Sequence, residues 1–248
     1  MRSGGSKRAM AAAAACFMAT ALAGCGSPRT QAHHGEVPRP GGPSGTARPS
    51  VPVAPPRVPG VGERLWRKVP AGTRQVVAVY GDREDSPDST LVLYEKRGES
   101  WQKKGSWPAH NGKRGWTTDH HEGDERTPVG VFTLSDAGGL LEDPGSRLPY
   151  TQDEDAFLSP FYWEEAHWHD FDYVIAIDYN RLRGTRPDDP TRPQGQSKGG
   201  GIWLHLDHGD GTLGCVSVPG SAMEYLLRTL DPRDKPVVVM GDRANLRA

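Results

Sequence analysis

The chain has 248 residues, and its 30 basic and 31 acidic side chains give a formal net charge of -1. With no basic stripe and no arginine-rich arm, nucleic acid is not expected as a partner. About 185 residues follow the first 62, which is enough for one domain with a hydrophobic core.

The first 24 residues have the pattern of an export signal. Basic residues precede an alanine-rich apolar run, Ala9–Ala23, which is too short to span a bilayer comfortably. The run ends in Leu22-Ala-Gly-Cys25, which resembles the lipobox of bacterial lipoproteins, where cleavage precedes a cysteine that is then acylated. We therefore expect residues 1–24 to be a lipoprotein signal peptide and Cys25 to be the lipidated residue. A plain secretory signal is the alternative, and Cys16 is removed in either case.

Residues 25–62 are dominated by Pro, Gly, Ser and Arg and contain few large side chains. Such a segment cannot bury enough apolar surface to offset the entropy lost on ordering. We expect an extended, disordered tether that lets a folded unit reach away from a membrane surface. Residues 63–248 are then expected to form a single folded domain.

Short β-like runs, separated by turn-rich stretches, recur along this domain and predict a mainly β (α+β) fold. They are Gln75–Tyr80, Thr90–Glu95, Val129–Leu134, Tyr173–Tyr179, Ile202–Leu206 and Val237–Met240.

One segment predicts a helix, since Ser221–Leu230 repeats apolar residues on a single face before Asp231-Pro232 ends it. Two stretches without periodicity predict loops. Ala109–Thr127 contains three histidines, and Asn180–Gly201 is rich in Arg, Pro, Asp and Gly, as expected of a long loop or lid beside a site.

Cys215 is the best candidate nucleophile. After processing it is the only cysteine with a free thiol, and an exported protein that keeps an unpaired thiol implies a use for it. A thiol attacks as thiolate and needs a base, for which His205, at the end of a predicted strand, is the natural partner. Gly214 allows a sharp turn, so that its amide and that of Cys215 could both face an oxyanion.

Two motifs in the chain resemble those of the L,D-transpeptidases of the YkuD type. The first combines His205 with Thr212-Leu-Gly-Cys-Val216, and the second is Arg126-Thr-Pro-Val-Gly-Val-Phe-Thr-Leu134. The resemblance covers about residues 76–240 and implies a single mixed, β-sandwich-like catalytic domain with one helix after the cysteine. Many members have histidine just before the Gly-Cys pair and arginine two places after the cysteine, where this chain has Leu213 and Ser217.

The resemblance implies acyl transfer on peptidoglycan, with stem tetrapeptides as donor and acceptor and with neither cofactor nor metal. Cys215 would form a thioester with release of D-alanine, and His205 would act as the base. Thr212 would orient His205 through its backbone carbonyl. Tyr179, at the end of a predicted strand, is a further candidate for donating a hydroxyl to the oxyanion, although an ordinary strand aromatic is the simpler interpretation.

Three alternatives remain open. An L,D-carboxypeptidase would use water as the acceptor. A zinc-dependent wall amidase or peptidase would combine His205 and His208 with His120, His121 or Cys215, although histidines three apart in a strand and turn do not share a face. A non-catalytic wall-binding lipoprotein would use the scattered tryptophans. His167 and His169, close to Trp163, Trp168 and Phe171, are interpreted as part of a packed aromatic surface.

Overall fold

The computed structural model describes residues 56–248. The predicted signal peptide, Cys16, Cys25 and the tether up to residue 55 lie outside the described residues. None of the helices formed by residues 56–248 combines the length and the apolar character needed to cross a membrane.

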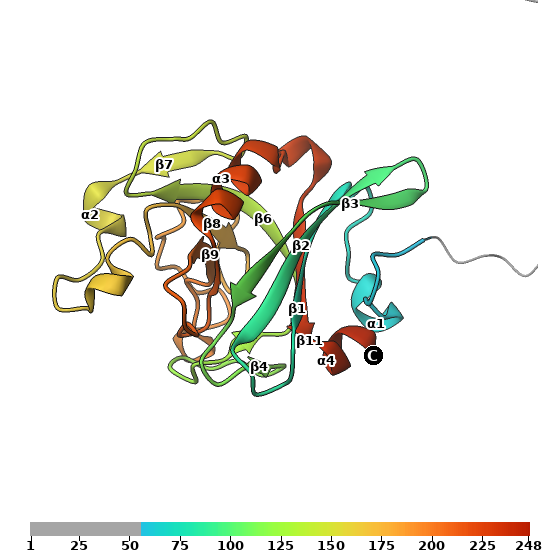
Figure 1. The fold of residues 1–248 in the computed structure, drawn as a ribbon, viewed down its shortest axis with the longest axis horizontal. Helices are drawn as coiled ribbons and strands as arrows, with labels where there is room; N and C mark the ends of the chain where they lie inside the picture. The colour runs from blue at the N-terminus through green and yellow to red at the C-terminus, as the bar shows by residue number, and fades with distance from the viewer. Residues whose placement is uncertain (1–55) are drawn as a thin grey trace, which may run out of the picture. The chain divides into compact units, whose positions relative to one another are not determined.

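A mixed nine-stranded sheet organises the described residues (Figure 1). Its spatial order is β11 (Val237–Asp242), β1 (Gln75–Gly81), β2 (Asp88–Arg97), β3 (Ser100–His110), β10 (Val216–Val218), β9 (Trp203–Leu206), β8 (Val174–Ile177), β6 (Gly130–Gly139) and β7 (Tyr150–Gln152). Strand β11 pairs with β1 in parallel and with β6 in antiparallel fashion, so the sheet closes on itself. A separate short parallel pair joins β4 (Trp116–Thr117) to β5 (Thr127–Pro128).

The mainly β prediction is confirmed, and all six predicted runs lie on strands. The sequence analysis did not identify β3 or β10. In β3 the segment Ser100–Lys104 is polar and exposed apart from Trp101, so it lacks the apolar alternation of a half-buried strand. Hydrogen bonds to β2 hold it in the sheet. Strand β10 has only three residues, too few to produce a periodic signal.

Strands β1 and β11 are apolar on both faces because each face packs against a different apolar cluster. Val77 and Val79 belong to the larger cluster inside the sheet, whereas Val76 and Ala78 belong to a second cluster outside it. Burial on both faces explains the uninterrupted apolar run in the sequence.

The N-terminal boundary of the folded part lies earlier than Glu63. Val58 and Val61, which the sequence analysis placed in the tether, are buried in the outer cluster together with Leu65 of helix α1 (Glu63–Trp66) and Leu246 of helix α4 (Arg243–Arg247).

The predicted helix is α3 (Gly220–Thr229), one residue displaced from the expected range. Its face of Ala222, Met223, Leu226 and Leu227 is fully buried in the larger cluster. The helix runs directly from β10, and it therefore fixes the strand that follows Cys215 onto the core (Figure 1). The remaining helical segments are short: α2 (Glu154–Phe157) and three 3-10 turns, η1 (Glu165–His167), η2 (Gln196–Lys198) and η3 (Pro232–Asp234).

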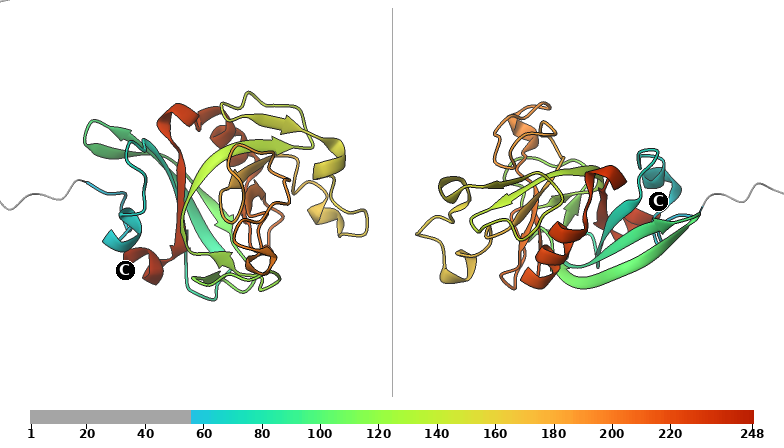
Figure 2. Two further views of the ribbon diagram at one scale, coloured as in Figure 1. Left: turned by 180° about the vertical axis from the view of Figure 1, so that it is seen from behind. Right: turned by 90° about the horizontal axis from the view of Figure 1, so that it is seen from above.

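The segment Asn180–Gly201 is a long loop with one 3-10 turn, as predicted, and it extends away from the sheet (Figure 2, orange). Its ends are tied together, because the side-chain amide of Asn180 donates to the carbonyls of Gly195 and Gly199. Residues 180–200 do not line the cavity beside Cys215. The segment that borders this cavity is instead the aromatic loop of residues 162–171.

Candidate active site

His205 lies on strand β9, and Cys215 immediately precedes the parallel strand β10. Strand β10 pairs with β9 so that Val216 faces Leu204 and Ser217 faces His205. Leu204 and Val216 point into the apolar core, and alternation along a strand therefore turns His205 and Cys215 toward the opposite face. Both line one cavity of about 350 Å³.

The sulfur of Cys215 lies against the backbone just before β9. The Trp203 amide donates to Sγ over 3.4 Å, and the thiol donates to the Gly201 carbonyl over 3.5 Å. These contacts hold the side chain of Cys215, a residue of intermediate exposure, at the wall of the cavity.

Burial dominates the protonation of both groups. It lowers the pKa of His205 to about 4, against the opposing effect of the nearby Asp170 carboxylate. It raises the pKa of the Cys215 thiol to about 11, although the Trp203 amide acts in the opposite direction. These values favour a neutral thiol and a neutral imidazole at neutral pH, so a thiolate would form by transfer of the thiol proton.

The ring of His205 is oriented by its own neighbour in the chain. Its Nδ1 donates to the Leu206 carbonyl over 2.8 Å, so the proton resides on Nδ1 and Nε2 is left as the acceptor. The prediction that the carbonyl of Thr212 has this orienting role is therefore wrong. The Thr212 carbonyl instead accepts the Lys113 amide over 2.8 Å.

Thr212 supports the nucleophile rather than the base. Its hydroxyl donates to the Cys215 carbonyl over 2.7 Å and accepts the Gly214 amide over 3.1 Å. This pattern closes a tight turn, in which Gly214 has φ +141°, a value that side-chain-bearing residues rarely adopt. Because the Gly214 amide is engaged in this way, the prediction that it faces the oxyanion does not hold in this conformation.

A second threonine reaches the same carbonyl from a distant part of the sequence. The hydroxyl of Thr127, in the Thr-Pro motif, donates to the Cys215 carbonyl over 3.2 Å and accepts the Gly112 amide over 2.8 Å. The two motifs recognised in the sequence are thus joined through hydrogen bonds at Cys215.

Tyr179 does not reach the cavity. Its hydroxyl donates to the Lys198 carbonyl over 2.8 Å, and its ring packs edge-on against His120 and Phe132. The hydroxyl is therefore not available to an oxyanion at Cys215. The contacts of Tyr179 are those of an ordinary structural aromatic residue.

The two positions that depart from the family pattern have different surroundings. Leu213 lines the cavity and is 64% exposed, so it presents an apolar surface at the entrance. Ser217 is buried and donates to the carboxylate of Asp207 over 2.7 Å, and Asp207 also accepts from His110 Nδ1 at 2.7 Å. Position 217 is thus part of an internal polar network.

The zinc ligand set considered in the sequence analysis is not assembled. His120 packs against Tyr179, and neither His120 nor His121 lines the cavity. His208 does line it, but beside His167 and Asp170, which the sequence analysis did not select as site residues. The repeated His-x-x-Asp spacing of His167-Trp-His-Asp170-Phe-Asp172 was the available signal.

The described residues thus form a mainly β domain in which a histidine on one strand and a cysteine just before the neighbouring parallel strand line the same cavity. The family model for the L,D-transpeptidase catalytic domain, YkuD, matches residues 85–239, more than half of the chain, and the protein belongs to this family. The resemblance stated from its motifs is thereby confirmed.

Two solved structures are similar to the chain. Bd1075 from Bdellovibrio bacteriovorus shares 22% identity over 67% of this chain and 47% of its own, with a TM-score of 0.37. The helical cell shape determining protein Pgp2 from Campylobacter jejuni shares 21% identity over 71% of this chain and 50% of its own, with a TM-score of 0.41. The chain spans about half the length of these two structures. None of the curated proteins compared with the chain matches it.

Proposed function

We propose that the protein is a peptidoglycan L,D-transpeptidase that works through a thioester on Cys215. The observation that carries the proposal is that His205, on β9, and Cys215, at the start of the adjacent parallel strand β10, both line one cavity. Membership in the L,D-transpeptidase catalytic domain family supports the same chemistry.

In the first half-reaction, Sγ of Cys215 attacks the carbonyl carbon between the third, diamino residue and the terminal D-alanine of a tetrapeptide stem. The thiol proton passes to Nε2 of His205, which is free to accept it because Nδ1 donates to Leu206. The amide C–N bond then breaks, the leaving amine takes the proton, and D-alanine departs. The amide of Cys215 is the expected donor to the oxyanion.

In the second half-reaction, the side-chain amine of a neighbouring stem attacks the thioester. His205 takes the proton of the incoming amine, the C–S bond breaks, and the sulfur leaves as thiolate and is reprotonated. The product is a cross-link between the third residues of two stems. Attack by water instead of the amine would give the L,D-carboxypeptidase reaction.

The test is intact-protein mass spectrometry after incubation with a disaccharide tetrapeptide. The wild-type protein is expected to gain the mass of the acyl group and to release D-alanine, whereas Cys215→Ser is expected to do neither while keeping its circular dichroism spectrum. Turnover retained in Cys215→Ser would contradict the assignment. Adding an amine acceptor separates cross-linking from hydrolysis by the mass of the product.

We also propose that the enzyme is anchored by lipid at Cys25 on the outer face of the cytoplasmic membrane. The lipobox-like Leu22-Ala-Gly-Cys25 and the Pro-rich stretch that follows support this arrangement. Cys25→Ala is expected to move the protein out of the membrane fraction. An unchanged distribution between membrane and soluble fractions would argue against the anchor.

A further inference from the structure

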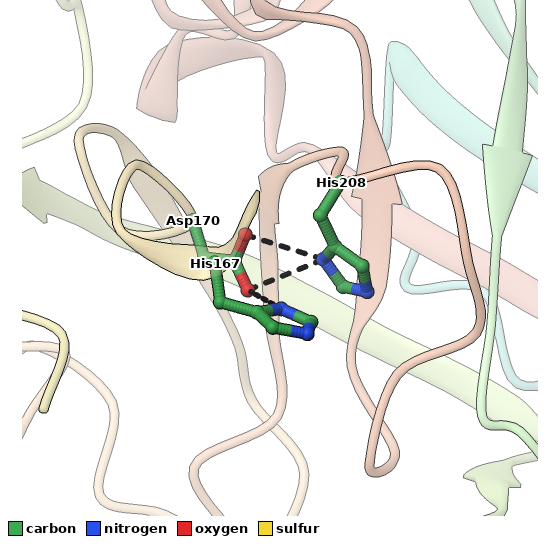
Figure 3. Close-up of side chains that lie close together, drawn as sticks. All are labelled: His167, Asp170 and His208. Atoms are coloured by element: carbon green, nitrogen blue, oxygen red, sulfur yellow. Dashed lines mark hydrogen bonds and ion pairs between the residues drawn. The ribbon is translucent and has the colours of Figure 1, made fainter. Parts of the chain in front are cut away.

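Two imidazoles converge on one carboxylate at the wall of the cavity. Nδ1 of His167 lies 3.1 Å from Oδ2 of Asp170, and Nδ1 of His208 lies 3.2 Å from the same oxygen. In Figure 3 the two rings lie side by side, with their centroids 4.2 Å apart, and the carboxylate faces the Nδ1 atom of each ring. The three potential ligand atoms all lie within 4.8 Å of one another.

The three side chains come from two parts of the fold. His167 ends the 3-10 turn η1 and Asp170 follows it in the same loop, whereas His208 lies in the turn after β9 (Figure 3). Asp170 and His208 have side chains only 6% and 5% exposed, while that of His167 is 27% exposed. The carboxylate is thus buried between its partners, and the more exposed ring of His167 lies toward solvent.

The spacing of these atoms suits a tetrahedral metal ion. Zinc binds nitrogen and oxygen ligands at roughly 2.0–2.1 Å, which places tetrahedral neighbours about 3.3 Å apart. Both nitrogen–oxygen separations, 3.1 and 3.2 Å, are close to this value, which is also that of a hydrogen bond. Two imidazoles with one carboxylate form a donor set suited to zinc, whereas magnesium prefers oxygen ligands and retains several waters.

We propose that His167, Asp170 and His208 form a binding site for Zn²⁺ beside the nucleophile. Three protein ligands leave one tetrahedral position free, and all three residues line the cavity that contains Cys215. His205 is not a ligand, because its Nδ1 is held by Leu206 and its Nε2 is assigned to proton transfer. The proposal goes beyond the transpeptidase chemistry, which requires no metal.

The experiment measures binding of Zn²⁺ to the full chain, without a histidine tag and after removal of metal by dialysis against a chelator. Isothermal titration is expected to give one Zn²⁺ per chain, and Mg²⁺ is expected to give no binding in the same cell. His167→Gln and His208→Gln are each expected to weaken Zn²⁺ affinity at least about tenfold. Circular dichroism checks that each variant is folded. Because His167 is the more exposed of the two histidines, its substitution is expected to disturb folding less.

His169→Gln is the matched control. His169 lies in the same loop and forms the same type of contact, with its Nδ1 3.0 Å from Asp172, but no second imidazole meets that carboxylate. Its substitution is expected to leave the Zn²⁺ affinity unchanged. Cys215→Ser is expected to retain the site, which separates this proposal from the proposed function.

Three results would overturn the proposal. They are a wild-type chain that binds no Zn²⁺, an affinity unaffected by both His167→Gln and His208→Gln, and complete loss of binding in Cys215→Ser. The last result would assign the metal to the thiol, and none of the three bears on whether Cys215 forms a thioester.

Discussion

The backbone amide of Trp203 donates to the sulfur of Cys215, with nitrogen and sulfur 3.4 Å apart. This hydrogen bond favours thiolate, yet burial outweighs it and raises the pKa of the thiol to about 11. The proposed mechanism therefore differs from that of cysteine enzymes that store a preformed thiolate. In it, Cys215 becomes reactive only when His205 takes the proton.

A first prediction concerns the reactivity of the thiol without substrate. Because the thiol is protonated at neutral pH, alkylation of Cys215 by iodoacetamide is expected to accelerate about tenfold for each pH unit between pH 7 and 10. Peptide mapping by mass spectrometry measures labelling at this position, and Cys215→Ser provides the blank. A rate that reaches its plateau below pH 8 would show that the thiol is ionised at rest.

A second prediction follows from the buried base. The pKa of His205 falls from 6.5 to about 4 on folding, so between these values the unfolded chain binds more protons than the folded one. The stability that His205 contributes is complete above pH 6.5 and is lost as the pH falls toward 4, by roughly 3 kcal/mol in total. Urea unfolding in the presence of a chelator measures this loss between pH 7 and 4.

The His205→Gln variant is expected to lose less stability than the wild type over the same pH range. Asp178, whose pKa is raised by burial, acts inside this window in the wild type and in the variant alike, so the comparison removes its effect. Further shifted groups act outside the window. The carboxylates with lowered pKa values, such as Asp207, titrate below their usual range, and the raised pKa of His208 matters above pH 6.5. His169→Gln is the control, because the His169 side chain is 78% exposed, and its free energy of unfolding is expected to change with pH as in the wild type. Equal slopes for the wild type and His205→Gln would contradict the assignment.

A third prediction concerns the link between the two motifs. Thr127→Val removes the donor to the Cys215 carbonyl and leaves the buried Gly112 amide without its acceptor. The expected cost is about 1–3 kcal/mol in the free energy of unfolding, together with slower thioester formation. Urea unfolding and the acylation rate measure the two effects. Thr127→Ser keeps the hydroxyl and should restore most of both, and a fully stable Thr127→Val would exclude the supporting role.

The strands and the helix could be predicted because their apolar residues recur with the period of the element. The neighbouring placement of Cys215 and His205 also followed from the sequence, since a strand, a tight turn and a glycine bring them together. The contacts of Thr212 and Tyr179 could not be predicted, because they depend on which backbone carbonyl each hydroxyl meets after folding. The contact of Asp170 with His208 could not be predicted either, because Asp170 lies in a loop without a periodic pattern that approaches His208 only in the folded chain.

A fourth prediction concerns substrate binding. Lys113 is exposed and lines the cavity, and its amide is fixed by the Thr212 carbonyl. Stem peptides carry carboxylates, so Lys113→Met is expected to raise KM for the tetrapeptide roughly tenfold with little change in kcat, as loss of a charge-assisted contact predicts. The difference between wild type and variant should shrink at high salt, because the contact is partly screened. Lys103→Met, an exposed lysine on β3 away from the cavity, is the matched control and should behave as the wild type. A KM that is unchanged in Lys113→Met, or one that rises equally in both variants, would remove Lys113 from substrate recognition.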